Sequence, residues 1–505
     1  MRHRTLVAAL CAALLCALLS SCSAWPDDDA SGATSTAARS TAGGQHKPNI
    51  VYVLTDDLSA DLVKYMPHVR QMQKEGTELP NFFATDSLCC PSRSSILTGE
   101  YPHNTGVFTN GGDDGGYKAF LKNGNEKECY APALQKAGYR TGFMGKYLNG
   151  YQPEAKKRGS VPSGWNEWDV AGDAYSEYNY DLNENGRVKH YGNDPEDYLT
   201  DVLSRKATSF VDDSARKKKP FMLQMSTFAP HGPATPAPRD KGKFPGLKAP
   251  RTPAYDKATE NAPEWQRDLT PLNATEKKRM DRTHAKRVRS VQAVDAMIGR
   301  LRDQLEKKGL ADDTYVMFGS DNGFHMGEHR LRQGKQTAYD TDIRVPMTVT
   351  GPGVPAGGRV SEFAENTDLA PTFKDLAGLK PDTEADGQSL AGLLRGQREK
   401  DWRDAVLVEH RHSSVKKGDP DAAPRNTGDP PSYEALRTAD ALYVEYADGE
   451  REFYALDSDP YQLENRADSL TEKQRAALHD RLAAMRKCKG AESCRAASQE
   501  RGRTE

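Results

Sequence analysis

Three acidic side chains and one amide follow two apolar stretches of the sequence, and together they suggest a cation site. Asp56 and Asp57 come directly after the apolar run 50–54, and Asp321 and Asn322 follow the run "TYVMFGS". Three carboxylates in one place require a compensating cation. Because all the donors are hard oxygen atoms, Ca²⁺ or Mg²⁺ is the favoured ion. Two plainer interpretations stay open: Asp-Asp can cap a helix, and Asp-Asn-Gly can form a turn.

A second group of reactive side chains lies in the segment "DSLCCPSRSSILTG", in which Cys89 and Cys90 are adjacent. Of the 8 cysteines in the chain, two lie in a predicted signal peptide and a third, Cys22, at its predicted cleavage site. The others are Cys89, Cys90, Cys129, Cys488 and Cys494. The last two are close in sequence and are expected to pair, and Cys129 is a candidate partner of Cys90. An odd count in an exported protein leaves one cysteine with a different fate, and Cys89 is that residue unless the adjacent pair forms a vicinal disulfide or stays as two buried thiols.

The elements that would position these groups occur in the order of an α/β fold. The continuous apolar run 50–54 is typical of a strand buried on both faces. Apolar side chains recur every three or four residues from Ala285 to Leu305, which predicts an amphipathic helix that stops at Gly309. A second buried strand is predicted at 314–320. Ligands of open α/β sheets bind outside the carboxyl ends of the strands, and both acidic clusters lie at such ends.

The N-terminal segment predicts export. Two arginines precede an apolar run at residues 6–19, which suits a signal-peptide core and is too short for a membrane span. The sequence "LSSC" that ends at Cys22 resembles a bacterial lipobox. We therefore expect residues 1–21 to be removed and Cys22 to anchor a cell-surface lipoprotein, with ordinary secretion as the alternative. Residues 22–46 are expected to form a flexible tether, and the lipid is the only membrane contact expected.

The rest of the chain is expected to form a large catalytic domain at 47–400, a small subdomain at 401–496 and a disordered tail at 497–505. Two apolar-rich runs about the Asp-Gly pair at 448–449 give a strong hairpin signal in the small subdomain, and residues 474–485 predict a closing helix. The 70 basic and 72 acidic residues nearly cancel, so no overall field favours nucleic acid as a partner.

These features come together in a family resemblance. The chain is similar to the type I sulfatases of the alkaline-phosphatase-like superfamily, because "CCPSRSSILTG" fits that family's C-x-P-S-R-x-x-x-L-T-G element. The further matches, in the family's order, are "AGYRTGFMGKYLNGY", "FAPHGP", "GSDNGFHMGEH", "KQTAYDTDIRVP", "DLAPTF" and "EFYALDSDPYQLEN". The variants "CCPSRSSILTG" and "GKYLNGY" are most similar to the N-acetylglucosamine-6-sulfatase branch. The resemblance implies a large mixed sheet flanked by helices, with a smaller C-terminal antiparallel sheet and a helix.

In that family a dedicated enzyme oxidises the first cysteine of the element to formylglycine, an aldehyde, and the resemblance implies this fate for Cys89. One hydroxyl of the hydrated aldehyde attacks sulfur, and the other expels sulfate by regenerating the carbonyl. The implied cation, Ca²⁺ or alternatively Mg²⁺, binds the sulfate and residue 89 and polarises the S–O bonds. The implied metal ligands are Asp56, Asp57, Cys89, Asp321 and Asn322.

The resemblance also implies four cationic residues around the substrate. Arg93 would hold the hydrated aldehyde and balance the carboxylates. Lys146, His231 and Lys335 would surround the sulfate and stabilise the charge of the transition state, and His231 or Lys335 would protonate the leaving oxygen. One position departs from the family, since many members have a histidine where this chain has Leu148. The candidates for the missing group are Asn149, His103, His325 and His329.

The implied function is hydrolysis of sulfate monoesters of aryl or sugar alcohols, with a sulfated small molecule or glycan as the substrate and the formylglycine-generating enzyme as a partner during maturation. Two alternatives stay open: a phosphodiesterase or phosphonate monoester hydrolase of the same superfamily, and a non-catalytic glycan-binding surface lipoprotein. The segment 150–186 is rich in aromatic residues that either pack internally or contact sugar rings. These residues are Trp165, Trp168, Tyr175, Tyr178 and Tyr180.

Overall fold

The structure is a computed structural model that describes residues 47–153, 161–412 and 429–499. The predicted signal peptide, Cys22, the tether 22–46 and residues 500–505 of the expected tail lie outside the described residues, so these interpretations stay predictions. From Lys47 onward the described chain forms one compact unit, and the domain boundary expected after residue 400 also stays a prediction. Among the helices of the described chain, none combines the length and the apolar composition that a membrane span requires.

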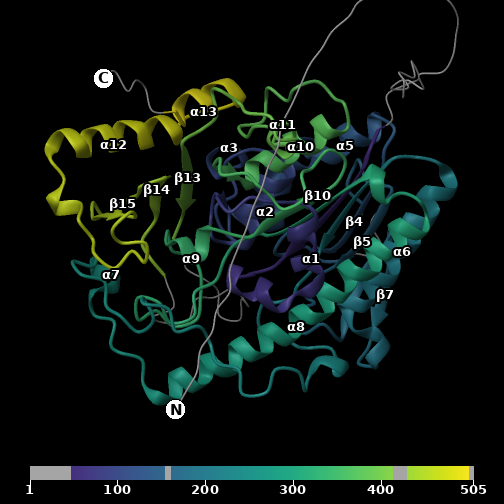
Figure 1. Ribbon diagram of the computed structural model, residues 1–505, viewed down its shortest axis with the longest axis horizontal. Coiled ribbons are helices and arrows are strands. Elements are labelled where there is room, and N and C mark those ends of the chain that lie inside the picture. Colours follow the sequence, from purple (N-terminus) through teal and green to yellow (C-terminus); the bar gives the residue numbers. More distant parts are fainter. Residues whose placement is uncertain (1–46, 154–160, 413–428, 500–505) are drawn as a thin grey trace, which may run out of the picture. The chain divides into compact units, whose positions relative to one another are not determined.

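A mixed sheet of ten strands lies at the centre of the described chain (Figure 1). In spatial order its strands are β11 (Gly358–Arg359), β2 (Thr77–Glu78), β10 (Met347–Thr350), β9 (Thr314–Ser320), β1 (Asn49–Thr55), β8 (Phe221–Ser226), β4 (Arg140–Lys146), β5 (Glu167–Ala171), β6 (Tyr180–Glu184) and β7 (Arg187–Tyr191). The neighbours β9, β1, β8 and β4 run parallel, so their carboxyl ends meet at one edge. The two strands predicted as buried are β1 and β9, and every residue of both is buried.

Helices cover both faces of this sheet, which explains the continuous apolar run of β1. On one face α1 (Pro67–Glu75), α6 (Leu199–Lys217) and α8 (Ala274–Lys307) pack with Val51 and Val53. On the other face α5 (Tyr130–Lys136) and α10 (Leu369–Leu376) pack with Ile50 and Tyr52. Because successive side chains of a strand point to opposite faces, both sets must be apolar.

The helix α8 is longer than predicted at its N-terminal end. Asn273 caps it: its side chain accepts from the backbone N–H groups of Thr275 and Glu276, and the Glu276 carboxylate accepts from the Asn273 N–H. This capping box starts the helix well before Ala285, in turns whose largely polar, exposed side chains carry no amphipathic signal. The predicted end is confirmed, since Gly309 adopts a left-handed conformation with φ of 66° directly after the last turn.

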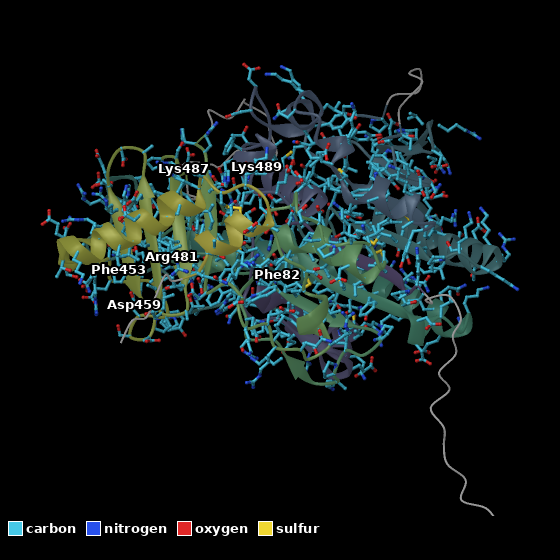
Figure 2. The ribbon with its side chains drawn as sticks, turned by 90° about the horizontal axis from the view of Figure 1, so that it is seen from above. Phe82, Phe453, Asp459, Arg481, Lys487 and Lys489 are labelled. Carbon is cyan, nitrogen blue, oxygen red and sulfur yellow. A yellow bond between two sulfur atoms is a disulfide. The ribbon has the colours of Figure 1, made fainter. Side chains whose placement is uncertain are left out.

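The small C-terminal sheet is confirmed and has four antiparallel strands. They are β13 (Ala405–His410), β14 (Tyr433–Thr438), β15 (Ala441–Tyr446) and β16 (Arg451–Ala455). The predicted hairpin is the β15–β16 pair, in which Glu445 lies opposite Arg451. The predicted closing helix is α12 (Glu472–Met485), followed by α13 (Ala491–Ala497). Figure 2 labels Arg481 of α12 and Phe453 of β16 in this part of the chain. It also labels Phe82, which is wholly buried in the core of the large sheet.

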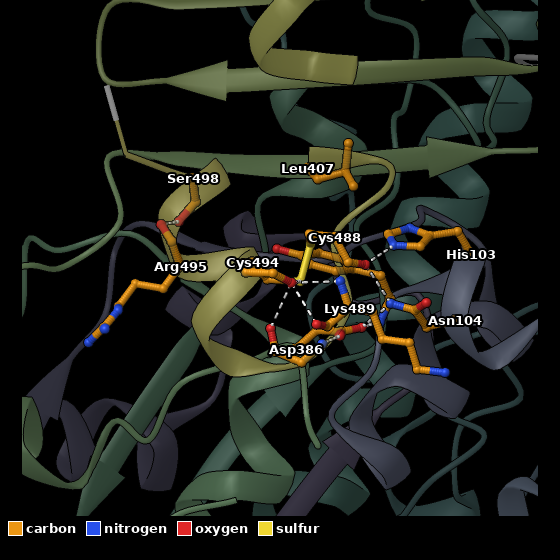
Figure 3. The surroundings of a disulfide bond; sticks show 12 residues. His103, Asn104, Asp386, Leu407, Cys488, Lys489, Cys494, Arg495 and Ser498 are labelled. Carbon is orange, nitrogen blue, oxygen red and sulfur yellow. Dashed lines mark hydrogen bonds between the residues drawn. A yellow bond between two sulfur atoms is a disulfide. The ribbon is translucent and has the colours of Figure 1, made fainter. Parts of the chain in front are cut away.

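The disulfide expected near the C-terminus is present, and the loop that it closes contacts a short helix after α2 (Cys89–Thr98). Cys488 and Cys494 are bonded. The Cys488 carbonyl accepts hydrogen bonds from His103 Nε2 (2.8 Å) and Asn104 Nδ2 (2.9 Å) (Figure 3). Both donors belong to the short helix α3 (Pro102–Thr105). The Asp386 carboxylate reinforces the contact by accepting from the backbone N–H of Gly490 and from Asn104.

The predicted pairing of Cys90 with Cys129 is wrong. Cys90 and Cys129 are both buried free thiols. The Cys129 thiol lies 3.4 Å from the Asn125 carbonyl, and burial raises the pKa of Cys129 above its ordinary range. Burial also raises the pKa of Cys90 to about 12. Both thiols therefore stay protonated and act as small apolar side chains of the core.

The remaining elements are short. The helices are α2 (Cys89–Thr98), α4 (Gly116–Lys122), α7 (Glu264–Arg267), α9 (Asp340–Ile343) and α11 (Ala391–Leu394), and a two-stranded sheet pairs β3 (Phe82–Phe83) with β12 (Ala364–Glu365). The 3₁₀ turns are η1 (Ala60–Tyr65), η2 (Asn125–Lys127), η3 (Pro195–Asp197), η4 (Pro238–Asp240), η5 (Ala311–Asp313), η6 (Asn366–Asp368) and η7 (Ala467–Ser469).

Candidate active site

The four oxygen-bearing residues come together at the carboxyl ends of β1 and β9. The last residues of the two strands, Thr55 and Ser320, lie opposite each other in the sheet, so the residues that follow them emerge side by side. The Asp57 N–H donates to Asp321 Oδ1 (3.1 Å), and Asn322 Nδ2 donates to Asp57 Oδ1 (2.8 Å). The four residues are Asp56, Asp57, Asp321 and Asn322, and all are almost fully buried. The capping interpretation of Asp-Asp does not apply, because Ser59 is the residue that precedes η1.

Cys89 is the first residue of α2 and points into this cluster. Its Sγ lies 3.2 Å from Asp56 Oδ1 and 3.9 Å from Asp57 Oδ1, and Lys335 Nζ donates to it at 2.8 Å. The N-terminal end of a helix favours negative charge, which suits a nucleophile that becomes anionic. Cys90 instead belongs to the apolar core under the sheet. The geometry thus distinguishes the two adjacent cysteines, because Cys89 faces the carboxylates and Cys90 does not.

Arg93 and Lys146 contact the carboxylates of Asp321 and Asp56. Arg93 lies one turn after Cys89 on α2, and its Nε donates to Asp321 Oδ2 at 2.7 Å. Its Nη1 donates to the Lys146 carbonyl at 2.9 Å, which ties α2 to the end of β4. The Lys146 ammonium, on the last residue of β4, donates to Asp56 Oδ2 at 2.7 Å.

Lys335 and His231 both contact Asp57. Lys335 lies in the loop between β9 and α9, and its Nζ donates to Asp57 Oδ1 at 2.6 Å. His231 follows β8, and its Nε2 lies 3.6 Å from Asp57 Oδ2. The His231 Nδ1 donates to the Gly232 carbonyl at 2.8 Å, so Nε2 is the ring atom that faces the cluster. The structure therefore brings together all the residues predicted for the site, while their catalytic roles stay predictions.

The carboxylates of the cluster are paired with cationic side chains. Asp56, Asp57 and Asp321 meet the guanidinium of Arg93 and the ammonium groups of Lys146 and Lys335, and all six side chains are at most 5% exposed. The residues that carry the carboxylates differ in environment. Burial alone would raise the pKa of Asp56, but Lys146, His231, Arg93 and Lys335 together hold it below its ordinary value. Burial raises the pKa of Asp321 to about 6 in spite of Arg93.

The carboxylate and amide oxygens of the cluster suit a hard divalent cation. One ligand atom each from Asp56, Asp57, Cys89 and His231 lies within 4.8 Å of the others, so the close group also holds a thiol and an imidazole, which are softer donors. The side-chain oxygen of Asn322 is buried and has no hydrogen-bond partner among the described residues, as expected of an oxygen reserved for an ion. Asp321 is not in the close group: its two oxygens face Arg93 and the backbone N–H groups of Asp57 and Asn322. Its role as a metal ligand stays a prediction.

The four candidates for the missing histidine lie in different places. Leu148 itself is part of the apolar core. His103 contacts Glu409 (2.8 Å) and the C-terminal disulfide loop. His329 stacks on Tyr339 at 3.9 Å, and burial lowers its pKa to about 3. The two others are His325, whose Nδ1 lies 2.9 Å from an Asp342 oxygen, and Asn149, whose Nδ2 donates to the Tyr175 hydroxyl at 3.3 Å.

Two residues of the site were not assigned to it from the sequence. Tyr175 lies in the aromatic segment, and its ring contacts His231 and Lys146. Arg287 is a buried side chain of α8 whose Nη2 donates to the Asp57 carbonyl. A basic residue on the apolar face of a predicted helix is a signal that could have marked Arg287. The other four residues of the aromatic segment pack with neighbouring rings, which confirms the packing interpretation for them.

Comparisons with known proteins agree with this arrangement. A family model described as "Sulfatase" matches residues 48–379, and one described as "N-sulphoglucosamine sulphohydrolase, C-terminal" matches residues 327–488. The N-acetylglucosamine-6-sulfatase of Homo sapiens is 33% identical over 477 residues, which is 89% of this chain and 86% of that protein. An extracellular sulfatase SULF-1 homolog of Drosophila melanogaster is 36% identical over 73% of this chain, which spans 34% of that relative's length. A putative extracellular sulfatase Sulf-1 homolog of Caenorhabditis elegans is likewise 36% identical, and this chain spans 52% of its length.

Solved structures share the fold. A protein in complex with its substrate D-glucosamine-2-N,6-O-disulfate has a TM-score of 0.73 at 24% identity, covering 88% of this chain and 98% of that one. The phosphonate monoester hydrolase of Agrobacterium radiobacter has a TM-score of 0.66 at 20% identity, covering 87% and 96%. At these identities the likeness shows the architecture, a large mixed sheet flanked by helices with a small antiparallel sheet, as predicted.

Proposed function

The chain belongs to the sulfatase family, and on that premise we propose that it hydrolyses sulfate monoesters of aryl or sugar alcohols, with N-acetylglucosamine 6-sulfate as the leading candidate substrate. The observation that carries the proposal is the position of Cys89, at the N-terminal end of α2 and in contact with Asp56 and Lys335. Similarity to N-acetylglucosamine-6-sulfatases along most of both chains supports the choice of sugar. Export, with a lipid anchor at Cys22, is part of the proposal. The similarity to extracellular sulfatases supports export, and the anchor rests on the lipobox-like sequence alone.

We assign the nucleophile to residue 89 after oxidation of its thiol to formylglycine by a maturation enzyme. The hydrated aldehyde supplies one hydroxyl that attacks sulfur and a second that lets sulfate depart. Arg93 contributes by orientation: its guanidinium is fixed by Asp321 and by the Lys146 carbonyl and lies one helical turn from residue 89. It therefore keeps a positive charge beside the nucleophile throughout the reaction.

A divalent cation, Ca²⁺ or alternatively Mg²⁺, completes the proposed site. Asp56, Asp57, Asp321, Asn322 and residue 89 would hold it. When bound, it supplies positive charge that lowers the pKa of a coordinated hydroxyl and polarises the S–O bonds. The oxygen-rich donors and the reserved Asn322 oxygen support this assignment.

The remaining cations bind the sulfate and the leaving oxygen. The ammonium groups of Lys146 and Lys335 contact Asp56 and Asp57 beside residue 89, where they stabilise negative charge that grows as the S–O bond breaks. His231 has its Nδ1 proton committed to the Gly232 carbonyl. When protonated it therefore carries its second proton on Nε2, the atom that faces the cluster, and that proton can pass to the leaving oxygen.

The test compares substrates on protein produced together with a formylglycine-generating enzyme. Turnover of an aryl sulfate should exceed turnover of the matched aryl phosphodiester and phenylphosphonate. The reverse order would favour the phosphonate monoester hydrolase reading, which the shared fold keeps as the second candidate. A panel of sulfated monosaccharides then identifies the sugar. Inactivity on all of them, with residue 89 shown by mass analysis to be oxidised, would refute the enzyme proposal in favour of glycan binding.

A further inference from the structure

The segment between β5 and β6 places one aromatic side chain against the cations of the site. The Tyr175 ring centroid lies 4.6 Å from that of His231 and 4.8 Å from Lys146 Nζ. The ring also packs edge-on against Phe228, with the two ring centroids 5.1 Å apart. The Tyr175 hydroxyl accepts a hydrogen bond from Asn149 Nδ2 at 3.3 Å. One half-buried side chain thus touches two residues of the candidate site, Lys146 and His231.

We propose that Tyr175 is a positioning residue, whose ring holds the Lys146 ammonium and the His231 imidazole in the orientation that binds sulfate. This inference rests on the proposed function, since it deepens the account of that site. It concerns residues of this chain alone, and its sulfate-affinity readout does not depend on turnover.

The ring is the feature that matters, because the Lys146 ammonium and the His231 imidazole both lie against it. A lysine side chain is flexible and loses much rotamer freedom when fixed. Lys146 is fixed at one side by Asp56 (2.7 Å), and the face of Tyr175 lies on another side, where a cation–π contact is stronger in a desolvated place. Lys146 and His231 are only 3% and 5% exposed, so water does not replace this contact.

The backbone around Tyr175 is anchored strongly enough for the ring to act in this way. Glu177, two residues later, accepts hydrogen bonds at one carboxylate oxygen from the Thr200 N–H (2.9 Å) and hydroxyl (2.8 Å). The Glu177 carbonyl also accepts from the Leu199 N–H at 3.0 Å. Both partners are in the first turn of α6, and Ala174 on the other side is fully buried. Tyr175 is therefore attached to a 19-residue helix of the scaffold rather than to a free loop.

Leu148, where the chain departs from the family, lies in the apolar core. Asn149, the next residue, reaches the Tyr175 hydroxyl, so Tyr175 and Asn149 form the polar wall beside Lys146. This wall joins a residue that follows β4 to one that follows β5.

The experiment compares Tyr175→Leu, Tyr175→Phe and the control Tyr178→Leu, all in the full chain with residue 89 oxidised. Tyr178 lies three residues away and packs edge-on against Tyr198, with ring centroids 5.4 Å apart, so its removal tests general damage to the segment. Two quantities are measured: kcat for an aryl sulfate, and the dissociation constant of inorganic sulfate by calorimetry. A cation–π contact in a desolvated place corresponds to about 30-fold in either quantity.

We expect Tyr175→Leu to lower kcat and weaken sulfate binding by about 30-fold each, and Tyr175→Phe to recover most of both because it keeps the ring. Tyr178→Leu should change neither. Equal sulfate affinity in wild type and Tyr175→Leu would overturn the inference, as would a Phe variant as defective as the Leu variant. If wild type hydrolyses no sulfate ester, the proposed function fails separately, and the same pattern of sulfate affinities would still support the positioning role.

Discussion

Replacing Lys335 by alanine tests whether the site's charges are balanced as the structure indicates. Lys335 is 5% exposed and donates to Asp57 Oδ1 (2.6 Å) and Cys89 Sγ (2.8 Å). Its removal leaves the buried Asp57 carboxylate without its closest cation. Breaking one half of a buried pair costs about 3–5 kcal/mol.

This cost can be converted into a melting temperature. The unfolding entropy is about 2.1 cal/mol/K per residue, or about 0.9 kcal/mol/K for the roughly 450 residues from Lys47 onward. We therefore expect the metal-free Lys335→Ala protein to melt about 3–6 °C below the metal-free wild type. A divalent ion at Asp57 would supply the missing charge, so most of this difference should disappear when Ca²⁺ is present.

Activity gives a second, independent readout of the same variant. Loss of a group that stabilises transition-state charge lowers kcat by about 10²–10³-fold, and KM for a small aryl sulfate should change far less. Lys241→Ala is the matched control, because it removes an exposed lysine outside the site and should leave both Tm and kcat unchanged.

The assay is calorimetric melting of wild type and both variants in chelator and in excess Ca²⁺, followed by kinetics on one aryl sulfate. Two results would refute the reasoning. A Tm loss that is the same with and without Ca²⁺ would mean that Lys335 and the ion do not share Asp57. A kcat loss no larger than that of Lys241→Ala would mean that Lys335 only attracts anions.

Three further predictions follow from the same site and from the C-terminal sheet. Mass analysis of residue 89 in active protein should show an aldehyde or its hydrate, and an unmodified thiol there would contradict the assignment of the nucleophile. The Cys89→Ser variant produced aerobically should fold normally and be nearly inactive. Chelation should lower both activity and Tm, since an ion that binds only the folded state stabilises it, and Ca²⁺ should restore both, whereas a stoichiometric transition metal would disprove the choice of ion. Burial raises the pKa of Glu452 to about 7 despite hydrogen bonds from three tyrosines, so its contribution to stability is complete below pH 4.5 and is lost as the pH rises through about 7. The fall in Tm between pH 5 and pH 8 should therefore be smaller in Glu452→Gln than in wild type, and parallel Tm curves would exclude Glu452 as a source of the pH dependence.

Much of the fold was predictable because its signals are local. The strands β1 and β9 are short apolar runs whose full burial follows from helices on both faces of the sheet, and the β15–β16 hairpin follows from one Asp-Gly pair. The start of α8 was missed because its first turns are polar and are held by the Asn273 cap rather than by packing.

The parts that escaped prediction depend on contacts between distant segments. Nothing local distinguishes a thiol that pairs from one that fills the core, and Cys90 and Cys129 are of the second kind. Tyr175 is one of several aromatic residues in its segment, and its approach to His231 follows from the parallel order of β8, β4 and β5. The strands β2 and β11 have two residues each, which is too short for any periodic signal.

The carboxylate cluster shows how far an argument from charge alone can reach. Three clustered carboxylates predicted a cation, and the structure supplies three from Arg93, Lys146 and Lys335. In this arrangement the two lysines contact carboxylate oxygens of Asp56 and Asp57. A divalent ion would use the same oxygens. An ion bound there would compete with the ammonium groups for those oxygens and leave them available to a sulfate. Charge balance therefore couples metal binding to substrate binding, and inorganic sulfate should bind more tightly in Ca²⁺ than in chelator; equal affinities would mean that the lysines stay on the carboxylates in both states.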